Sequence, residues 1–190
     1  MRKLGLVEFV SVDGVMQGLA GPEEGFPYGG WGNDYPLVFP DGSQAGPTSE
    51  TTAYLFGRRT YEHMAAFWPY QPDANAMAAH LNATPKYVVS STLSDVSWDP
   101  TTIIRTDVMA SVSALKAHGD GSIVVLGSGE LTRSLLAEGL VDTVTLFVHP
   151  LLLGTGQALF GDLPDVRRLH LESNAVSELG TVVLTYSVVS

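Results

Sequence analysis

The chain has 190 residues, of which 45% are hydrophobic, and it carries a formal net charge of −10. A chain of this length and composition can bury a sizeable core, so we expect a single domain over residues 1–190. The negative charge argues against a nucleic-acid partner, since binding to a phosphate backbone requires a basic surface. The complete absence of cysteine excludes disulfides, thiolate metal sites and cysteine nucleophiles.

The N-terminal segment has no features of a signal peptide or an anchor. Residues 1–6 are charged and lack a continuous apolar stretch. No part of the sequence approaches the roughly 18 consecutive apolar residues that a membrane-spanning helix needs. We therefore expect a soluble cytoplasmic protein that has no membrane partner.

The first part of the chain predicts one strand followed by a long loop. Residues 3–11 alternate loosely and end in the turn Ser11-Val12-Asp13-Gly14, which indicates a strand and its loop. Residues 18–47 are rich in glycine and proline, carry Trp31 and show no sustained period. A loop of this length is often functional. A surface loop anchored by its aromatic residues is the alternative, and the sequence leaves both open.

The next segment predicts a buried strand, a glycine and a helix. The apolar run Ala53–Phe56 indicates the strand, and residues 58–68 indicate a helix that Pro69 ends. Arg58 and Arg59 lie in the first turn of this helix, where cations oppose the helix dipole unless an anion is bound. This conflict favours an anion-binding site over its alternative, a solvated basic pair.

Four further elements are predicted from apolar spacing and from glycine or proline breaks. One of the strands ends in Ser90 and Ser91, whose hydroxyls can donate hydrogen bonds to phosphate oxygens. Serine is also common at strand ends, so this signal is weak by itself. The predicted elements are a helix over 74–82, strands over 86–92 and 102–105, and a helix over 107–118.

A second junction from strand to glycine to helix occupies residues 123–136. The apolar run Ile123–Leu126 meets Gly127 and Gly129, and leucines then follow at helical spacing. Backbone N–H groups at such a junction point towards a small volume where an anion can bind. The motif lacks the third small residue of the Rossmann fingerprint and the lysine of a Walker loop. An ordinary strand-to-helix turn is the alternative.

The remaining elements complete an α/β pattern. Strands that alternate with helices indicate a largely parallel sheet, to which a terminal hairpin adds an antiparallel edge. Ligands of such sheets bind beyond the carboxyl ends of the strands, so we expect the turns at Gly57, Ser90 and Gly127 to converge. The last elements are a strand over 141–149, an apolar glycine-rich loop over 151–156, and hairpin strands over 167–176 and 181–189.

Seven segments carry a similarity to a known family. They are Ser11–Gly14, Leu55–Glu62, Trp68-Pro69, Lys86–Ser91, Leu126–Leu131, Gly139–Asp142 and Pro150–Gly156. In this order they resemble the dihydrofolate reductase-like superfamily, and within it the group related to the reductase domain of the bifunctional riboflavin-biosynthesis deaminase-reductase. The resemblance covers nearly the whole chain, and the block Gly57–Glu62 is its most specific part.

The resemblance implies a three-layer α/β fold with a mixed, mostly parallel sheet of about eight strands that binds NADPH at the strand ends. Guanidinium groups and hydroxyls suit a 2′-phosphate, so we expect NADPH rather than NADH. One departure is Ser128, which stands where the family turn often continues a run of glycines. By resemblance, the adenosine-side phosphates contact Gly57, Arg58, Arg59 and Thr60, and the 2′-phosphate lies near Ser90 and Ser91. The resemblance places the nicotinamide beside Asp13 and Gly14. It places the pyrophosphate over the turn formed by Gly127, Ser128, Gly129, Glu130 and Leu131.

The substrate side does not match the family as well. Dihydrofolate reductases carry a carboxylate on the helix before the Gly-Arg strand, whereas here Asp34, Asp41 and Glu50 are candidates by position only, so we do not expect folate reduction. The five histidines lack metal-ligand spacing, and we expect no metal site. His149 stands at a predicted strand end where it can line a pocket, although an ordinary satisfied or exposed histidine is the commoner outcome.

We therefore predict an NADPH-dependent reductase that transfers a hydride to a small heterocyclic or carbonyl substrate. The substrate pocket is expected between the 18–47 loop, Trp31 and Trp68, and no catalytic residue is assigned. The alternative is a non-catalytic nucleotide-binding or regulatory protein, which the lack of a placed proton donor favours. The resemblance also implies a homodimer, whose interface we expect at the loop Leu151–Leu153 and the final hairpin.

Overall fold

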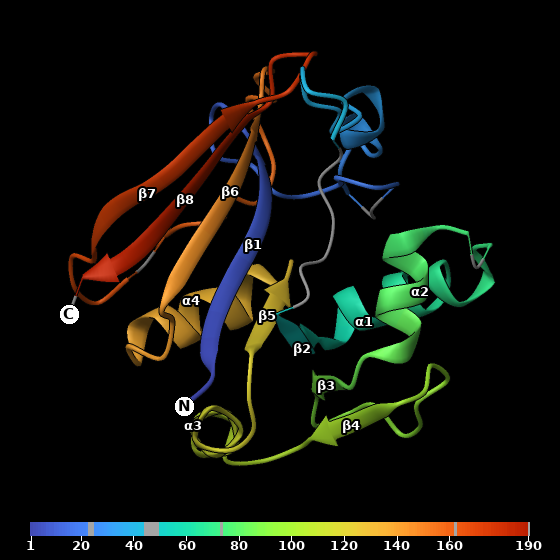
Figure 1. Cartoon of the computed structure of the whole chain (residues 1–190), viewed down its shortest axis with the longest axis vertical. Helices are drawn as coiled ribbons and strands as arrows, with labels where there is room; N and C mark the ends of the chain where they lie inside the picture. The colour runs from blue at the N-terminus through green and yellow to red at the C-terminus, as the bar shows by residue number, and fades with distance from the viewer. Residues whose placement is uncertain (23–24, 44–49, 73, 162, 190) are drawn as a thin grey trace. The chain divides into compact units, whose positions relative to one another are not determined.

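The computed structural model describes residues 1–22, 25–43, 50–72, 74–161 and 163–189 (Figure 1). Eight strands form one sheet in the order β4-β3-β2-β5-β1-β6-β8-β7. The chain divides into two compact units: unit 1 comprises residues 1–6 and 46–142, and unit 2 comprises residues 7–45 and 143–190. The predicted α/β class, with a mixed sheet and a C-terminal antiparallel hairpin, is confirmed. A single domain over residues 1–190 stays a prediction.

Unit 1 alternates strands with helices. Its three strand pairs β2–β3, β2–β5 and β3–β4 are all parallel. Helices α1 and α2 lie beside β2 and β3 (Figure 1). The elements are β2 (Thr51–Gly57), α1 (Arg58–Ala65), η2 (Trp68–Tyr70), α2 (Ala76–Ala83), β3 (Lys86–Val89), β4 (Thr101–Ile104), α3 (Val108–Ala117), β5 (Ser122–Leu126) and α4 (Gly129–Ala137).

Strand β2 lies in the core of unit 1. A parallel strand that is covered on both faces needs a continuous apolar run, and Ala53–Phe56 are all buried. Each fully buried side chain of the size of Leu or Phe stabilises the fold by about 1.5–3 kcal/mol relative to an exposed one. This buried strand gives a fixed base to the turn that follows it at Gly57. Tyr54 and Phe56 pack in one cluster with Tyr61, Ala65, Leu81, Val88 and Trp98.

Lys86 is buried at the start of β3, with an exposed fraction of 1%. Its Nζ donates hydrogen bonds to the backbone oxygens of Leu81 (2.8 Å) and Thr84 (2.9 Å), and it lies 4.6 Å from the centre of the Trp98 ring. The last carbonyls of a helix have no partners within the helix, so Lys86 caps the C-terminal end of α2. Burial lowers the pKa of Lys86 to about 8, and the charge of Asp99 opposes this shift.

Unit 2 consists of strands and loops. Strand β1 starts in unit 1 and continues into unit 2, where β8 pairs with β6 and β7 in antiparallel fashion. No α-helix occurs among the residues of unit 2 that the structure describes. Strand β7 is exposed along its whole length, and β8 is mostly half-buried. The elements are β1 (Lys3–Ser11), η1 (Trp31–Asp34), β6 (Thr143–His149), β7 (Arg168–Val176) and β8 (Val182–Val189).

Two predicted elements are shorter than expected. The helix predicted over 58–68 ends at Ala65, and Trp68–Tyr70 form a separate 3₁₀ turn. Pro69 disfavours an α conformation at the residue before it, which prevents a last α-helical turn. The strand predicted over 86–92 ends at Val89, because Ser90 Oγ accepts hydrogen bonds from the next backbone N–H groups and forms a turn.

Two further predictions concern the loop and membrane association. Residues 23–24 and 44–47 of the predicted 18–47 loop lie outside the described residues. The described remainder contains the short helix η1, turns and single bridge residues at Phe26 and Val38. Within the part of the chain that the structure describes, no helix is both long enough and apolar enough to span a bilayer.

Candidate cofactor site

Two strand-to-helix turns of unit 1 contact each other through Ser128. Strand β2 passes into α1 at Gly57, and the parallel neighbour β5 passes into α4 just after Gly127. Ser128 Oγ accepts a hydrogen bond from the Gly57 N–H (2.7 Å) and donates one to Thr60 Oγ1 (2.8 Å). The structure therefore brings together the two glycine turns that the sequence singled out.

The backbone of the second turn is left-handed at two successive residues. Gly127 has φ of 62°, and Ser128 has φ of 69° and ψ of 59°. A Cβ atom at Gly127 would lie 3.2 Å from Thr60 Cγ2, so glycine is needed there for the conformation and for close approach. At Ser128 the left-handed conformation costs about 1–2 kcal/mol, and the two hydrogen bonds of its side chain offset this cost. Ser128 therefore links the two turns by hydrogen bonds that a glycine at this position could not make.

The two arginines of the first turn have different surroundings. Arg58 Nη1 lies 2.9 Å from Glu62 Oε2 on the same helix, in an exposed ion pair of the kind that contributes little to stability. Arg59 is exposed, and it has no ion-pair partner among the described residues. Arg59 is therefore the cation at this turn that is available to an external anion.

The third predicted phosphate turn follows β3. Gly57 is paired with Val89 across the β2–β3 ladder, so Ser90 lies one residue beyond the end of the paired strands. Ser90 is buried, and its Oγ accepts hydrogen bonds from the N–H groups of Thr92 (3.2 Å) and Leu93 (2.9 Å). Ser90 shapes the turn, whereas Ser91 is exposed and presents its hydroxyl to solvent.

Asp13 and Gly14 belong to unit 2, where Asp13 holds a second loop in place. Its carboxylate accepts hydrogen bonds from Ser11 Oγ (2.6 Å) and from the N–H groups of Gly154 (2.7 Å) and Leu153 (3.2 Å). These bonds, first that of the Ser11 hydroxyl, lower the pKa of Asp13 to about 2. Two segments of the family resemblance, Ser11–Gly14 and Pro150–Gly156, are therefore joined directly.

A comparison with protein families settles the classification. Residues 2–185 match the model of the RibD C-terminal domain. The chain belongs to this family. Among curated proteins, the uncharacterized protein YyaP of Bacillus subtilis is 23% identical over 188 residues, which cover 97% of this chain and 94% of YyaP.

Solved structures share the fold at low sequence identity. A putative riboflavin biosynthesis protein of Shewanella sp. PV-4 superposes with a TM-score of 0.76 and 20% identity, and the match covers 99% of each chain. Dihydrofolate reductase of Enterococcus faecalis, solved in complex with NADP(H), gives a TM-score of 0.56 and 14% identity over 98% of this chain and 94% of its own. The predicted resemblance to the group of the riboflavin-biosynthesis reductase domain is confirmed, and the fold is shared with dihydrofolate reductase.

None of the three carboxylates considered for the substrate side has the surroundings of a proton donor. Asp34, Asp41 and Glu50 are all exposed, whereas a carboxyl group that donates a proton near neutral pH needs an apolar setting that raises its pKa. The pKa of Asp41 is instead lowered by its hydrogen bonds with Ser43, first that with the side chain. These positions therefore give no support to a pterin-binding carboxylate.

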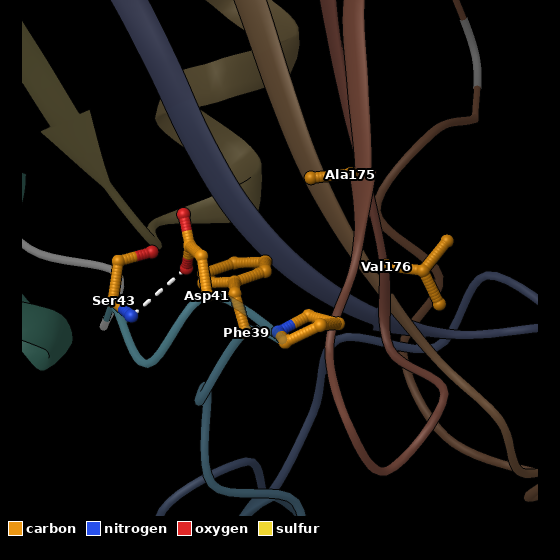
Figure 2. A pocket seen from close by; sticks show the side chains of 6 residues that line it. Phe39, Asp41, Ser43, Ala175 and Val176 are labelled. Atoms are coloured by element: carbon orange, nitrogen blue, oxygen red, sulfur yellow. Dashed lines mark hydrogen bonds between the residues drawn. The ribbon is translucent and has the colours of Figure 1, made fainter.

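Asp41 lies at a shallow surface depression of about 510 Å³ in unit 2 (Figure 2). Its Oδ1 accepts a hydrogen bond from the Ser43 N–H (2.9 Å), and Val176 of β7 lies on the other side of the depression. The lining is mainly apolar and open to solvent, so it does not supply the converging polar groups of a substrate site. The full lining is Phe39, Pro40, Asp41, Ser43, Ala175 and Val176.

The two tryptophans expected at the substrate pocket lie in different units. Trp31 is 6% exposed in unit 2, and its Nε1 donates a hydrogen bond to the Gln17 oxygen (2.7 Å). Trp68 is half-buried in unit 1, with its Nε1 3.0 Å from Met64 Sδ. Each is held by its own unit, and the pocket expected between them stays a prediction.

Within the described residues, no group of three His, Asp or Glu side chains is arranged to hold a metal ion.

His149 is the residue whose surroundings the sequence did not predict. It is 1% exposed at the end of β6, and its Nδ1 lies 3.0 Å from Thr181 Oγ1. Burial lowers its pKa, so the ring is neutral at physiological pH. The only sequence signal was its place between an apolar strand and Pro150, which does not distinguish a structural histidine from a functional one.

Proposed function

We propose that the protein is an NADPH-dependent reductase that transfers a hydride to a small heterocyclic or carbonyl substrate. The observation that carries this proposal is the link through Ser128, which holds two helix-start turns together beside the unpaired Arg59. Free backbone N–H groups at helix starts bind phosphate oxygens, and NADPH supplies the hydride chemistry when it is bound.

The donor groups of unit 1 fit a dinucleotide that carries an additional phosphate. In a chain with a net charge of −10, a bound phosphate depends on local donors. Thr60 and Ser91 bring hydroxyls, and Arg59 brings a guanidinium group that can contact a phosphate with two parallel hydrogen bonds. The family and the neighbouring reductase solved with NADP(H) support a nicotinamide cofactor. Asp13 and Gly14 stay the predicted neighbours of the nicotinamide.

Arg59 provides the test of cofactor choice. We expect Arg59→Ala to weaken NADPH binding about tenfold or more, because a hydrogen bond to a charged group contributes about 1.5–3 kcal/mol. NADH binding should weaken less than NADPH binding, since NADH lacks the 2′-phosphate. Isothermal titration with both nucleotides measures this difference. Arg168→Ala removes an exposed arginine from β7 and serves as the charge-matched control.

Two results would contradict this proposal. If neither nucleotide raises the melting temperature of the wild-type protein, the cofactor site does not exist, because a ligand that binds only the folded state must stabilise it. If Arg59→Ala weakens NADPH and NADH binding equally, Arg59 does not recognise the 2′-phosphate.

A non-catalytic nucleotide-binding or regulatory protein is the second candidate. It is favoured by the exposed settings of Asp34, Asp41 and Glu50, none of which suits a proton donor. NADPH oxidation, followed by its absorbance with a panel of pyrimidine, pteridine and carbonyl compounds, separates the two candidates. Turnover of any compound supports the reductase, and NADPH binding without turnover across the panel supports the second candidate.

We also propose that two copies associate through the hairpin of β7 and β8. Strand β7 is the last in the sheet order and is exposed at all nine residues, including Leu169 (39%), Leu171 (45%) and Val176 (50%). An exposed apolar edge strand favours pairing with a second chain. Light scattering after size-exclusion chromatography should give a dimer mass for the wild type and a monomer mass for Leu171→Glu, with Tyr70→Glu in unit 1 as the control. A monomeric wild type would refute this arrangement.

A cytoplasmic location, and the absence of nucleic-acid and membrane partners, stay predictions from composition and charge. Cell fractionation tests the location directly. A filter-binding assay with duplex DNA at low salt tests the nucleic-acid prediction, since electrostatic binding is strongest under that condition.

A further inference from the structure

One ring nitrogen of His149 is buried without a hydrogen-bond partner. The exposed fraction of His149 is 1% and that of Thr181 is 0%, and the Thr181 hydroxyl engages Nδ1 at 3.0 Å. Nε2 is sealed from solvent and has no partner among the described residues. Whichever nitrogen carries the proton of the neutral ring, Nε2 is left with an unused N–H group or an unused lone pair.

Such a group is costly to keep in a protein interior. A buried donor or acceptor without a partner costs about 1–3 kcal/mol, and buried polar groups are almost always paired. Phenylalanine or leucine would fill the same space without this cost. The Thr181 hydroxyl moreover fixes the orientation of the ring, so that Nε2 points in one defined direction. An oriented but unused nitrogen is the arrangement expected of a group that meets a ligand.

Three aromatic side chains surround the His149 ring, and two of them are fixed. Phe9 lies 6.0 Å away in a stacked orientation, and Phe9 is itself stacked on Phe147 at 4.6 Å. Trp31 approaches at 5.4 Å with an interplanar angle of 78°, and it is anchored by the hydrogen bond from its indole Nε1 to the backbone. Neither ring can leave without breaking these contacts.

Tyr35 is the third aromatic neighbour, and it is held much less firmly. Its ring centre lies 5.3 Å from that of His149 at a tilt of 53°, which is neither a stacked nor an edge-on arrangement. The side chain is half-exposed at the end of η1, and its hydroxyl makes no hydrogen bond within the part of the chain that the structure describes. Tyr35 is therefore the neighbour of the His149 ring that is least restrained by contacts of its own.

We propose that His149 is a ligand contact in unit 2: a flat, uncharged heterocycle takes the place of the Tyr35 ring, and one of its polar atoms hydrogen-bonds to His149 Nε2. The aromatic walls select a flat ring, because such rings gain from stacked and edge-on contacts. They select an uncharged ring because Phe9, Trp31 and the neutral histidine offer no counter-charge. The single unused nitrogen selects a ring that has a carbonyl or an N–H group in its plane.

The location of His149 deepens the proposed function, on which this inference rests. The residues that follow it, Pro150–Gly156, form the loop held by Asp13, and Leu151 O accepts a hydrogen bond from the Val12 N–H (3.0 Å). His149 therefore belongs to the same loop cluster of unit 2 as Asp13 and Gly14, the predicted neighbours of the nicotinamide. The ligand of this site is then the substrate that accepts the hydride.

Long-range ¹H–¹⁵N spectra of the histidine side chains test the contact directly. Uracil and 4-pyridone are suitable probes, because both are flat and uncharged and carry carbonyl groups. Benzene is the matched ring without a polar atom. We expect a saturable shift of the His149 Nε2 signal with at least one polar probe and none with benzene. Tyr35→Ala should tighten probe binding severalfold, because the tyrosine ring no longer competes for the site.

Variants separate this contact from a structural role. His149→Phe keeps a flat buried ring and should weaken probe binding about tenfold, the effect of one lost hydrogen bond. His118→Phe, at the exposed C-terminal end of α3, should not change it. Thr181→Val keeps the histidine and frees its Nδ1, so it should alter the Nε2 signal of a folded protein. In turnover assays, His149→Phe should raise KM with a smaller effect on kcat.

Two results would overturn the inference. The first is an Nε2 signal that neither polar probe shifts in the wild type or in Tyr35→Ala. The second is probe binding to His149→Phe that equals binding to the wild type. The cofactor proposal has its own test, which is the melting temperature of His149→Phe with and without NADPH. If NADPH still raises this melting temperature, the cofactor proposal holds even when the probes do not bind at His149.

Discussion

The two units of the molecule cover their strands in different ways. In unit 1 the central strand β2 has four consecutive buried residues, Ala53–Phe56, and helices lie beside it. In unit 2 the strand β7 is exposed at all nine positions, and no α-helix occurs among the residues described there. Unit 1 thus covers its central strand with helices, whereas the loops of unit 2 are held by the hydrogen bonds of Asp13 and by a small apolar cluster around Val15, Phe26 and Trp31.

This difference corresponds to two ways of building a binding site. The turns at Gly57 and Gly127 follow neighbouring parallel strands and are joined through Ser128, so the helix starts after them are positioned before any anion arrives. In unit 2, aromatic rings from β1 and from η1 and its C-terminal end surround His149, and one of these rings is weakly held. A rigid site suits a cofactor whose phosphates do not vary, and an adaptable site suits a substrate that must enter and leave.

The largest expected effect comes from the core of unit 1. Phe56 has an exposed fraction of 0%, and we expect Phe56→Ala to lower the free energy of unfolding by about 3–5 kcal/mol, because it leaves a cavity. Leu171→Ala on the exposed β7 should cost less than about 1 kcal/mol. Urea unfolding at low protein concentration measures both without a contribution from self-association. Equal costs would show that β7 is as well buried as β2.

A second prediction concerns the pH dependence caused by Lys86. Its folded-state pKa of about 8 lies below the usual 10.5, so the unfolded chain binds more protons between these values and stability rises with pH there. We expect a gain of roughly 1–3 kcal/mol between pH 8 and 10. Burial raises the pKa of Tyr54 to about 12, which opposes this trend only above pH 10.

Urea unfolding at several pH values, repeated with Lys86→Met, isolates this effect. The variant keeps a long apolar side chain and removes the titrating group, so its stability should be flat between pH 8 and 10. A wild type that loses stability over this interval would show that the carbonyl contacts of Lys86 outweigh its burial.

The link between the glycine turns should have a smaller effect on stability. Ser128→Ala removes both hydrogen bonds and retains the left-handed strain, so we expect a loss of about 1–2 kcal/mol together with weaker NADPH binding. Ser128→Gly removes the same bonds but relieves the strain, and it should cost less. Ser134→Ala, on the exposed side of the same helix, should stay within about 0.5 kcal/mol. A different order of the three variants in thermal unfolding would refute the proposed role of Ser128.

The smallest expected effect is local and belongs to unit 2. The pKa of Asp13 is lowered to about 2, so its stabilising bonds are fully present above the ordinary pKa of 3.8 and are lost as the pH falls through 2. Asp13→Asn should speed amide hydrogen exchange at Leu153 and Gly154, whose N–H groups it holds, with little change in global stability. Asp165→Asn on an exposed loop is the control. Unchanged exchange at Gly154 would show that Asp13 does not hold the loop.

Much of the fold could be predicted because its signals are local. Residues 3–11 alternate, and β1 spans Lys3–Ser11 as predicted. The predicted helix over 107–118 corresponds to α3, Val108–Ala117, with its C-terminal end marked by Gly119. The end of α1 was misplaced by three residues, because the effect of Pro69 extends back into the preceding turn.

The site could be predicted only in part because its decisive contacts are distant in sequence. The glycines at 57 and 127 were recognisable as turn residues, but the Ser128 contact with Gly57 spans 71 positions, and that of Asp13 with Gly154 spans 141. Similarly, the rings around His149 come from residues 9, 31 and 35. No local pattern shows that a lone histidine will be enclosed by aromatic side chains from another part of the chain.

The irregularity in β7 limits how far strand pairing can extend. The register of β7 against β8 shifts between Leu171 and Ser173, and the side chain of Glu172 at this point accepts a hydrogen bond from Ser187 Oγ (2.6 Å). Such a bulge bends and twists an edge strand. It also places a carboxylate on this strand, whereas stacking of many further chains on the edge needs a flat strand with apolar side chains. We therefore expect concentrated solutions of this protein to resist growth into fibrils during overexpression and storage, even though each copy carries the long exposed edge strand β7.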